Sequence, residues 1–184
     1  MTSTDIDRET ARDAAGTDLP DLDPALMRTV LGHFATGVVA ITGIDPQTAA
    51  PTGLAANSFT SVSLDPPLIA FCVAATSTSW PRVRAAGRYA VNILSEVQEP
   101  VCRQLATRRA DKFQGVEWRP SPAGAPILAD CLAWIEAELE AEHAAGDHTI
   151  VVSRVRHLYA SDLAPLIFFR GSYGSVGPSA ETPR

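Results

Sequence analysis

Glutamates alternate with apolar or small residues in EAELEAEH, residues 136–143. The alanine, glutamate and leucine content of this run favours a helix, but a helix would spread the four glutamates around its whole circumference. Strict alternation over eight residues has the period of a β-strand. The run therefore predicts a strand with one face in water, and it makes a mainly helical fold a poor explanation of the chain.

A second alternating run, HTIVVSRVRHLYA at 148–160, follows the short segment AAGDH. In a strand, Ile150, Val152 and Arg154 would share one face. Two such runs on either side of a glycine-containing turn predict one long β-hairpin. The turn needs Gly146 and could use Asp147, but it does not need His148, which makes this histidine a candidate functional residue.

The rest of the chain is predicted to form mostly strands. A helix is predicted over 24–34 from Asp23 as its cap and Pro24 in its first turn. Further strands are predicted over 36–42, 52–59, 68–74, 88–94 and 164–176, and further helices over 76–87 and 96–108. The double proline should end regular pairing in the polar stretch 60–67, and 110–126 reads as a long loop. Strands dominate without a βαβ rhythm, so we predict a mainly β (α+β) fold, an antiparallel barrel with a few short helices.

Length and charge suggest one domain with polar ends. The 184 residues favour a single domain, which we place at 23–177. Residues 1–22 are acidic and poor in large apolar residues, so we expect a disordered tail, and 178–184 should be a flexible C-terminal tail. A net charge of −6 without a basic block argues against nucleic-acid binding.

Several site classes lack their sequence signatures. No apolar run reaches the roughly 18 residues of a membrane span, and the N-terminus lacks the apolar segment of a secretory signal, so we expect a cytoplasmic protein. The three cysteines are widely spaced without a CxxC pair, which gives no indication of a metal site. The glycine pattern of a Rossmann dinucleotide site, a P-loop, an HExxH motif and a GxSxG motif are absent too.

Two stretches are crowded with hydroxyl and amide side chains. Asn57, Ser58, Thr60, Ser61 and Ser63 lie within seven positions, and the segment TSTS at 76–79 precedes a predicted helix. Hydroxyls and free N–H groups at a helix start can bind a phosphate without a lysine. Ordinary capping and turn chemistry is the better explanation of either stretch taken alone, and phosphate binding is the alternative.

The order of these stretches resembles the flavin reductase-like family. The similar segments are FATGVVAIT, GLAANSFTSVSLDPPLIAFCV, TSTSW, YAVNILSEVQ, DKFQGVEW, GDHTIVVSRV and PLIFFRGSYG, which together span roughly residues 26–176. Members of this family are small split β-barrels of the FMN-binding type, and they serve as reductase components of two-component flavin monooxygenases. The ANSFTSVSLDPP and GDH segments are the most specific parts of the resemblance.

The resemblance implies a role for each matching position. His148 would sit beside the nicotinamide as the catalytic residue. The phosphate of the flavin would be held by Thr76, Ser77 and Ser79. The remaining flavin contacts would be Thr36, Gly37, Val38, Ala56, Asn57, Ser58, Ser61, Val62, Ser63, Lys112, Phe113, Arg170 and Tyr173, with Gly146 and Asp147 shaping the turn before His148. Taken without the resemblance, Lys112 is better explained as a solvated loop charge.

The implied function is hydride transfer from NADH or NADPH to FMN or FAD, with the reduced flavin passed to a partner monooxygenase. A homodimer is implied as well. The family often carries a charged side chain around the TSTS stretch, whereas this chain has Ala74 and Ala75 before it and Thr78 within it. The choice of flavin and of nicotinamide nucleotide therefore stays open. The alternative function is a flavin-binding barrel that does not turn over NAD(P)H and serves in electron transfer or sensing.

Overall fold

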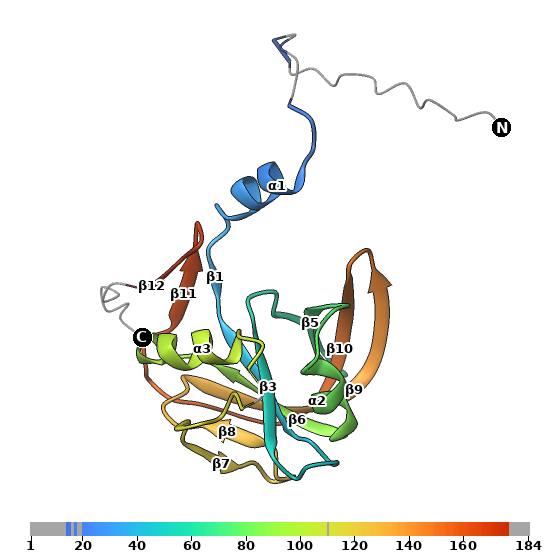
Figure 1. The fold of residues 1–184 in the computed structure, drawn as a ribbon, viewed down its shortest axis with the longest axis vertical. Coiled ribbons are helices and arrows are strands. Elements are labelled where there is room, and N and C mark those ends of the chain that lie inside the picture. The colour runs from blue at the N-terminus through green and yellow to red at the C-terminus, as the bar shows by residue number, and fades with distance from the viewer. Residues whose placement is uncertain (1–13, 16, 18–19, 110, 177–184) are drawn as a thin grey trace, which may run out of the picture.

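The computed structural model of the chain describes residues 14–15, 17, 20–109 and 111–176. The tail predicted for 178–184 and most of the tail predicted for 1–22 lie outside these residues. Figure 1 shows a curved sheet that forms the body of the molecule, with the first helix standing away from it. Within the described residues, no helix is both long enough and apolar enough to cross a bilayer.

Seven antiparallel strands form the main sheet, in the order β3-β2-β6-β9-β10-β5-β4. They are β2 (Val39–Ile44), β3 (Pro51–Ala56), β4 (Thr60–Leu64), β5 (Pro67–Ala74), β6 (Arg88–Ile93), β9 (Ala133–Ala145) and β10 (His148–Ala160). The long hairpin predicted from the alternating glutamates is confirmed as β9 and β10, each of 13 residues. The mainly β class and the antiparallel barrel are confirmed with it.

The sheet curls until β3 approaches β5, two strands that are not neighbours in the sheet. Ser58, just after β3, joins them: its Oγ accepts the N–H of Cys72 at 2.9 Å and donates to the carbonyl of Cys72 at 3.2 Å. Inside the curl, the rings of Phe71, Trp80 and Tyr89 pack edge to face, with centroids 5.4–6.3 Å apart. Aliphatic side chains from β2, β5, β6 and β10 complete this core.

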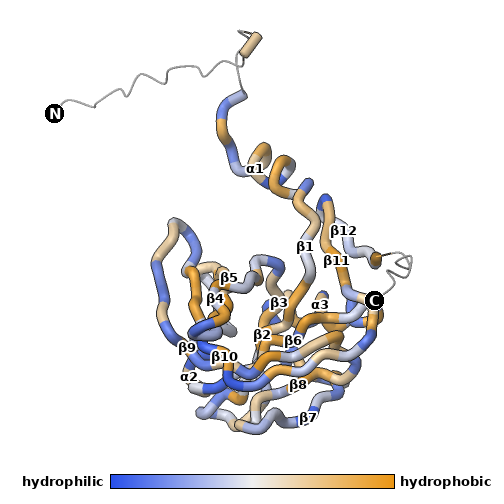
Figure 2. Tube along the Cα trace, turned by 180° about the vertical axis from the view of Figure 1, so that it is seen from behind, coloured by the Kyte–Doolittle hydropathy of each residue, from blue (hydrophilic) through white to orange (hydrophobic). Residues whose placement is uncertain are grey.

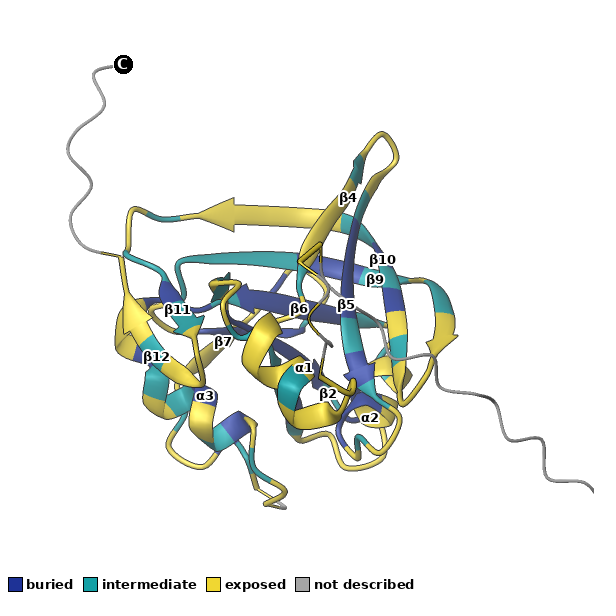
Figure 3. Ribbon diagram, turned by 90° about the horizontal axis from the view of Figure 1, so that it is seen from above, coloured by how far each residue is buried: buried dark blue, intermediate teal, exposed yellow. Residues whose placement is uncertain are grey.

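The helices are short, as expected. They are α1 (Pro24–Leu31), α2 (Trp80–Ala85), the 3₁₀ turn η1 (Glu96–Gln98) and α3 (Glu99–Leu105). Asp23 caps α1, since its Oδ1 accepts the N–H groups of Ala25 and Leu26 at 2.7 Å. A second core lies under α3, where Cys102 and Leu105 pack with Val38 of the neighbouring strand region. By contrast, α1 contains no buried residue, and Figures 2 and 3 show apolar, exposed surface along it.

Four segments differ from the sequence-based expectation. The single strand predicted over 164–176 is a hairpin of β11 (Leu166–Phe169) and β12 (Ser172–Ser175). Arg170 and Gly171 form its turn with φ of 49° and 78°, and a two-residue turn with positive φ matches the twist of a hairpin. The strand predicted over 36–42 breaks at Val38, because β1 (Thr36–Gly37) leaves the main sheet to pair with β11.

The polar stretch at 60–67 is also structured. It forms β4, and Leu64 pairs with Pro67 across the turn, so the double proline turns the chain without ending the pairing. Pro67 is tolerated because it is the exposed first residue of β5, where no ladder N–H is required. The long loop predicted over 110–126 contains β7 (Trp118–Pro120) and begins β8 (Pro126–Leu128), and these two strands pair with each other.

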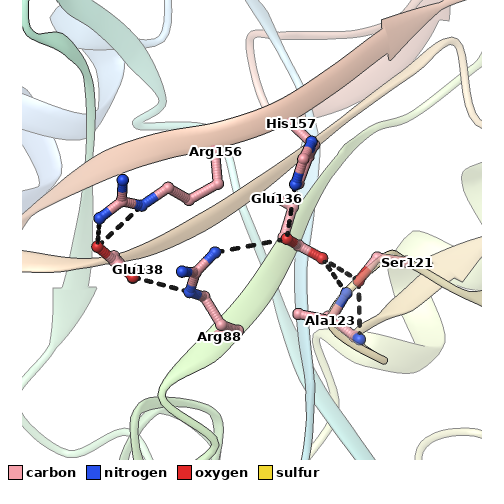
Figure 4. A network of polar contacts seen from close by, with 8 residues as sticks. Arg88, Ser121, Ala123, Glu136, Glu138, Arg156 and His157 are labelled. Carbon is pink, nitrogen blue, oxygen red and sulfur yellow. Dashed lines mark hydrogen bonds and ion pairs between the residues drawn. The ribbon is translucent and has the colours of Figure 1, made fainter.

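The glutamate face of β9 is not uniformly wet, contrary to the prediction. Glu136 is 1% exposed because the loop before β8 covers it. Its Oε2 accepts the Ser121 hydroxyl and, at 2.8 Å, the N–H of Ala123, while Oε1 lies 3.6 Å from Arg88 Nη1 (Figure 4). His157 Nε2 lies 3.9 Å from the same oxygen. Glu140, four residues along, is exposed as expected.

Glu136→Ala should strongly destabilise the fold. Removing the carboxylate leaves the buried Ser121 hydroxyl and the part-buried Ala123 N–H without their acceptor and takes one of two carboxylate partners from Arg88, which keeps Glu138. The free energy of unfolding should fall by about 3 kcal/mol. Urea titration followed by circular dichroism measures the loss. Glu140→Ala is the matched control, because it removes an exposed pair with Arg154 and should change the midpoint far less. Equal losses in the two variants would contradict the role of Glu136.

Candidate active site

A cavity of 370 Å³ opens where the ends of β3 and β5 meet. Its walls come from five places. They are the end of β3, the end of β5 with the following loop 76–79 (here the hydroxyl loop), the start of β10, the segment 105–108 at the end of α3, and Lys112. The lining residues are Leu54, Ala55, Ala56, Asn57, Ser58, Cys72, Val73, Ala74, Thr76, Ser77, Thr78, Ser79, Leu105, Ala106, Thr107, Arg108, Lys112 and His148.

The cavity has an apolar part and a polar part. Its strand walls carry small apolar side chains, among them Ala55, Ala56 and Ala74, which leave room for a flat ring against the backbone. Because β3 is an edge strand, alternate N–H and C=O groups along it also lack a strand partner. The hydroxyl loop, Arg108 and Lys112 supply hydrogen bonds and positive charge. An apolar ring joined to a polar chain and a phosphate, as in a flavin nucleotide, fits this distribution.

Trp80, which directly follows the hydroxyl loop in the chain, anchors this loop to the sheet. The Trp80 side chain is 6% exposed, and its Nε1 donates to Glu142 Oε1 of β9 at 2.8 Å. Arg84 of α2 pairs with the same carboxylate at 3.1 Å. Ser77 Oγ accepts the Trp80 backbone N–H at 3.2 Å. Among the described residues, Thr76 and Thr78 make no side-chain hydrogen bond, so their hydroxyls are available to a ligand.

Lys112 is neither a solvated charge nor a mobile ligand. Its Nζ donates to Ser79 Oγ and the Leu105 carbonyl at 2.9 Å and to the Gly53 carbonyl at 3.3 Å. Burial, and then the nearby charge of Arg82, lower the pKa of Lys112 from its usual value. This lysine therefore ties β3, the hydroxyl loop and the end of α3 together and places a positive charge between them.

The β9–β10 turn places His148 at the rim of the cavity. Gly146 has φ of +63°, as the first position of such a two-residue turn requires. The Asp147 carbonyl accepts the Ala75 N–H at 2.9 Å, and His148 pairs with Ala74 in the ladder. His148 Nδ1 lies 2.8 Å from Asp147 Oδ1, and this hydrogen bond lowers the pKa of the Asp147 carboxyl. Since a carboxylate only accepts, Nδ1 carries the hydrogen and Nε2 stays available.

A smaller cavity of 180 Å³ adjoins the first and shares Ala55, Ala56, Asn57 and Ala106 with it. Tyr173 lines it, with its ring edge-on to Phe168 and its hydroxyl 3.2 Å from Cys102 Sγ. Burial raises the pKa of Tyr173 to about 12 and raises that of the Cys102 thiol as well. Both shifts favour the neutral form of these groups at physiological pH.

The structure brings ten of the predicted site residues to these two cavities. Ala56, Asn57, Ser58, Thr76, Ser77, Ser79, Lys112 and His148 line the first, and Val38 and Tyr173 line the second. Several of them already bond within the chain. Ser58 gives its hydrogen to the Cys72 carbonyl, and Lys112 uses all three of its donors. Ser77, Ser79, His148 and Tyr173 each have one polar atom in an internal contact.

The other predicted residues do not line either cavity in this chain. They are Thr36, Gly37, Ser61, Val62, Ser63, Phe113, Gly146, Asp147 and Arg170. Phe113 is 7% exposed because it belongs to the core under α3. Ser61–Ser63 lie on β4, whose residues are mostly exposed, and Arg170 lines a separate surface hollow with Arg28 and His33.

Sequence reasoning missed Arg108, which lines the first cavity. The signal was present as the pair Arg108–Arg109, which lies between α3 and the single lysine of the chain. Cys72 was also missed, because its main contribution is a backbone group that holds Ser58. The described residues contain no group of three His, Cys, Asp or Glu side chains placed to hold a metal ion.

The fold and the cavity together define a split-barrel protein that can hold a flat, phosphorylated cofactor. Residues 31–177 match the sequence model described as the flavin reductase like domain, and the chain belongs to this family. The protein is accordingly an oxidoreductase of the NAD(P)H:flavin class, with FMN or FAD as the flavin.

Its relatives support this assignment. A flavin reductase of Pseudomonas putida is 46% identical over 154 residues, covering 83% of this chain and 90% of that protein. The reductase subunit HsaB of a flavin-dependent monooxygenase from Rhodococcus jostii is 43% identical over 163 residues, covering 88% and 83%. Both similarities extend over most of each chain.

Solved structures agree with the fold. A homologue of nitrilotriacetate monooxygenase component B from Mycobacterium thermoresistibile superposes with a TM-score of 0.81 at 41% identity, covering 87% of this chain and 90% of that chain. The NADH:FAD oxidoreductase SgcE6 of Streptomyces globisporus, in complex with NAD and FAD fragments, gives 0.81 at 33% identity, covering 89% and 100%.

Ser58→Ala should loosen the site as well as the fold. It removes the hydroxyl that joins β3 to β5 and leaves the Cys72 N–H and carbonyl without a partner, which should lower the free energy of unfolding by about 1 kcal/mol. The same variant should weaken flavin binding, measured by fluorescence titration. Ser61→Ala, on exposed β4, should stay within about 0.5 kcal/mol of the wild type. Unchanged stability in Ser58→Ala would refute the proposed joint.

Proposed function

We propose that the first cavity is the flavin site of this reductase and that His148 contacts the nicotinamide. The observation that carries the proposal is the meeting of three features in one cavity: small apolar strand ends, the hydroxyl loop and the His148 rim. The flavin ring would lie along Ala55 and Ala56, and its phosphate would take hydrogen bonds from Thr76 and Thr78 and charge from Arg108. The predicted contacts that line neither the first nor the smaller cavity remain predictions.

The protein's contribution to the reaction is mainly positional. The flavin supplies the electron-accepting chemistry by taking hydride from the nicotinamide. The cavity walls would hold the ring flat with one side open to the second nucleotide. Correct orientation of two substrates can supply a large share of the lowering of the activation barrier. Asp147 fixes the His148 ring through Nδ1, which leaves Nε2 as an acceptor for the nicotinamide amide when the imidazole is neutral.

The direct test follows NADH and NADPH oxidation at the nicotinamide absorbance band with FMN or FAD added. Oxidation well above the protein-free background is expected with at least one flavin. A flavin that binds tightly but is not bleached by either nucleotide would support the alternative, a flavin-binding protein without turnover. Adding a purified flavin-dependent monooxygenase then tests delivery of the reduced flavin to a partner.

His148→Ala should slow NAD(P)H oxidation at least tenfold, while the flavin dissociation constant changes by less than about threefold, because the residue is proposed to orient the nicotinamide and not the flavin. Stopped-flow absorbance measures the hydride step, and fluorescence titration measures flavin binding. His143→Ala, an exposed histidine on the same hairpin, is the control and should leave both unchanged. Equal losses of both quantities in His148→Ala would show that His148 has been misassigned.

A homodimer is part of the proposal, and exposed apolar residues support it. Met27, Val30, Leu31 and Phe34 in and after α1 are 45–76% exposed, and Leu64 on the β4 turn is 90% exposed. Apolar surface of this extent usually marks an interface. Sedimentation equilibrium tests the point, and a monomer at all concentrations would contradict it. A cytoplasmic location also stays a prediction, to be checked by cell fractionation.

A further inference from the structure

A third cavity, of 460 Å³, adjoins the proposed flavin cavity beside the hydroxyl loop. We call it the basic cavity, after the arginine and lysine side chains that line it. The two cavities share Thr78, Ser79, Arg108 and Lys112 in their walls, whereas His148 lines only the first. A ligand with a phosphate against the hydroxyl loop can therefore extend into the basic cavity and away from the histidine. A flavin mononucleotide ends at that phosphate and would leave the basic cavity unfilled.

The basic cavity carries an excess of positive charge. Arg82, Arg108 and Arg109 line it together with Lys112, and Asp45 is its one carboxylate. Asp45 lies 3.8 Å from Arg82 Nε and accepts the N–H of Gln47 at 2.9 Å, so its charge is already matched. In the part of the chain that the structure describes, Arg108 and Arg109 form no ion pair.

The position of Lys112 adds to this excess. Its three hydrogen bonds go to neutral oxygens, so no carboxylate compensates its charge. Repulsion from Arg82, after burial, lowers its pKa. Groups of one sign that repel one another around a cavity favour a ligand of the opposite sign, and guanidinium groups bind phosphoryl oxygens and stack on nucleobases.

We propose that the basic cavity binds the adenylate half of FAD, and that the protein therefore selects FAD over FMN. FAD differs from FMN by one further phosphoryl group and an adenosine, which match the arginines, the hydroxyls of Thr48 and Thr52 and the size of the cavity. The adenylate of NAD(P)H has the same chemistry. It is the weaker candidate because its nicotinamide is assigned to the His148 rim, which does not border the basic cavity. The inference rests on the proposed flavin site.

The test measures binding of oxidised FAD, FMN and AMP to the purified protein by isothermal titration calorimetry, without nicotinamide nucleotide. FAD should bind the wild type at least tenfold more tightly than FMN, and AMP should compete with FAD more strongly than with FMN. Arg109→Ala, which lies in the basic cavity alone, should weaken FAD about tenfold and FMN by less than about twofold. Because no turnover is needed, a failure of hydride transfer would leave this result intact.

A steric variant and a charge control complete the design. Ala50→Trp places a large ring in the basic cavity and should weaken FAD far more than FMN. Arg154→Ala removes an equal charge from the outside of β10, paired with Glu140, and should leave the FAD-to-FMN ratio unchanged. Equal affinities for the two flavins in the wild type would overturn the proposal. So would an Arg109→Ala variant that binds both flavins like the wild type but, in a separate titration, binds NADPH more weakly, which would assign the cavity to the other nucleotide.

Discussion

The Ser58 hydroxyl joins two walls of the proposed flavin cavity, and the shape of the cavity depends on that joint. β3 and β5 are separated by four other strands within the sheet, yet their ends must meet for a cavity to form between them. A single side chain bonded to both the N–H and the carbonyl of Cys72 closes this gap. The serine was expected to serve the ligand, and its hydrogen is used for the barrel itself.

A second set of contacts fixes the distance between the hydroxyl loop and His148. Trp80 follows the loop directly and is held by the aromatic core and by Glu142 of β9. His148 belongs to the same hairpin as Glu142, and its turn is bonded to Ala75 just before the loop. The two ends of the proposed reaction site are thus anchored on one hairpin, β9–β10.

The fold could be predicted from periodicity because alternation of apolar and polar residues is a local property. The β9–β10 hairpin and the short helices followed from it. The burial of Glu136 could not be predicted from periodicity. It depends on the loop between β7 and β8, where Ser121 lies fifteen residues before Glu136, and these two strands are only three residues long. In the site, hydroxyl-rich stretches were visible, but the contribution of Arg108 and the structural use of Lys112 depend on how α3 packs beside β3. Such contacts between distant segments are not encoded in any single pattern.

Amide hydrogen exchange with and without flavin tests the central claim, that the ligand lies between the ends of β3 and β5. Addition of flavin should slow exchange within residues 54–58 and 72–79 and change it little in β7 and β8. Protection confined to the hollow around Arg28 and Arg170, with none at the end of β3 or in the hydroxyl loop, would contradict it.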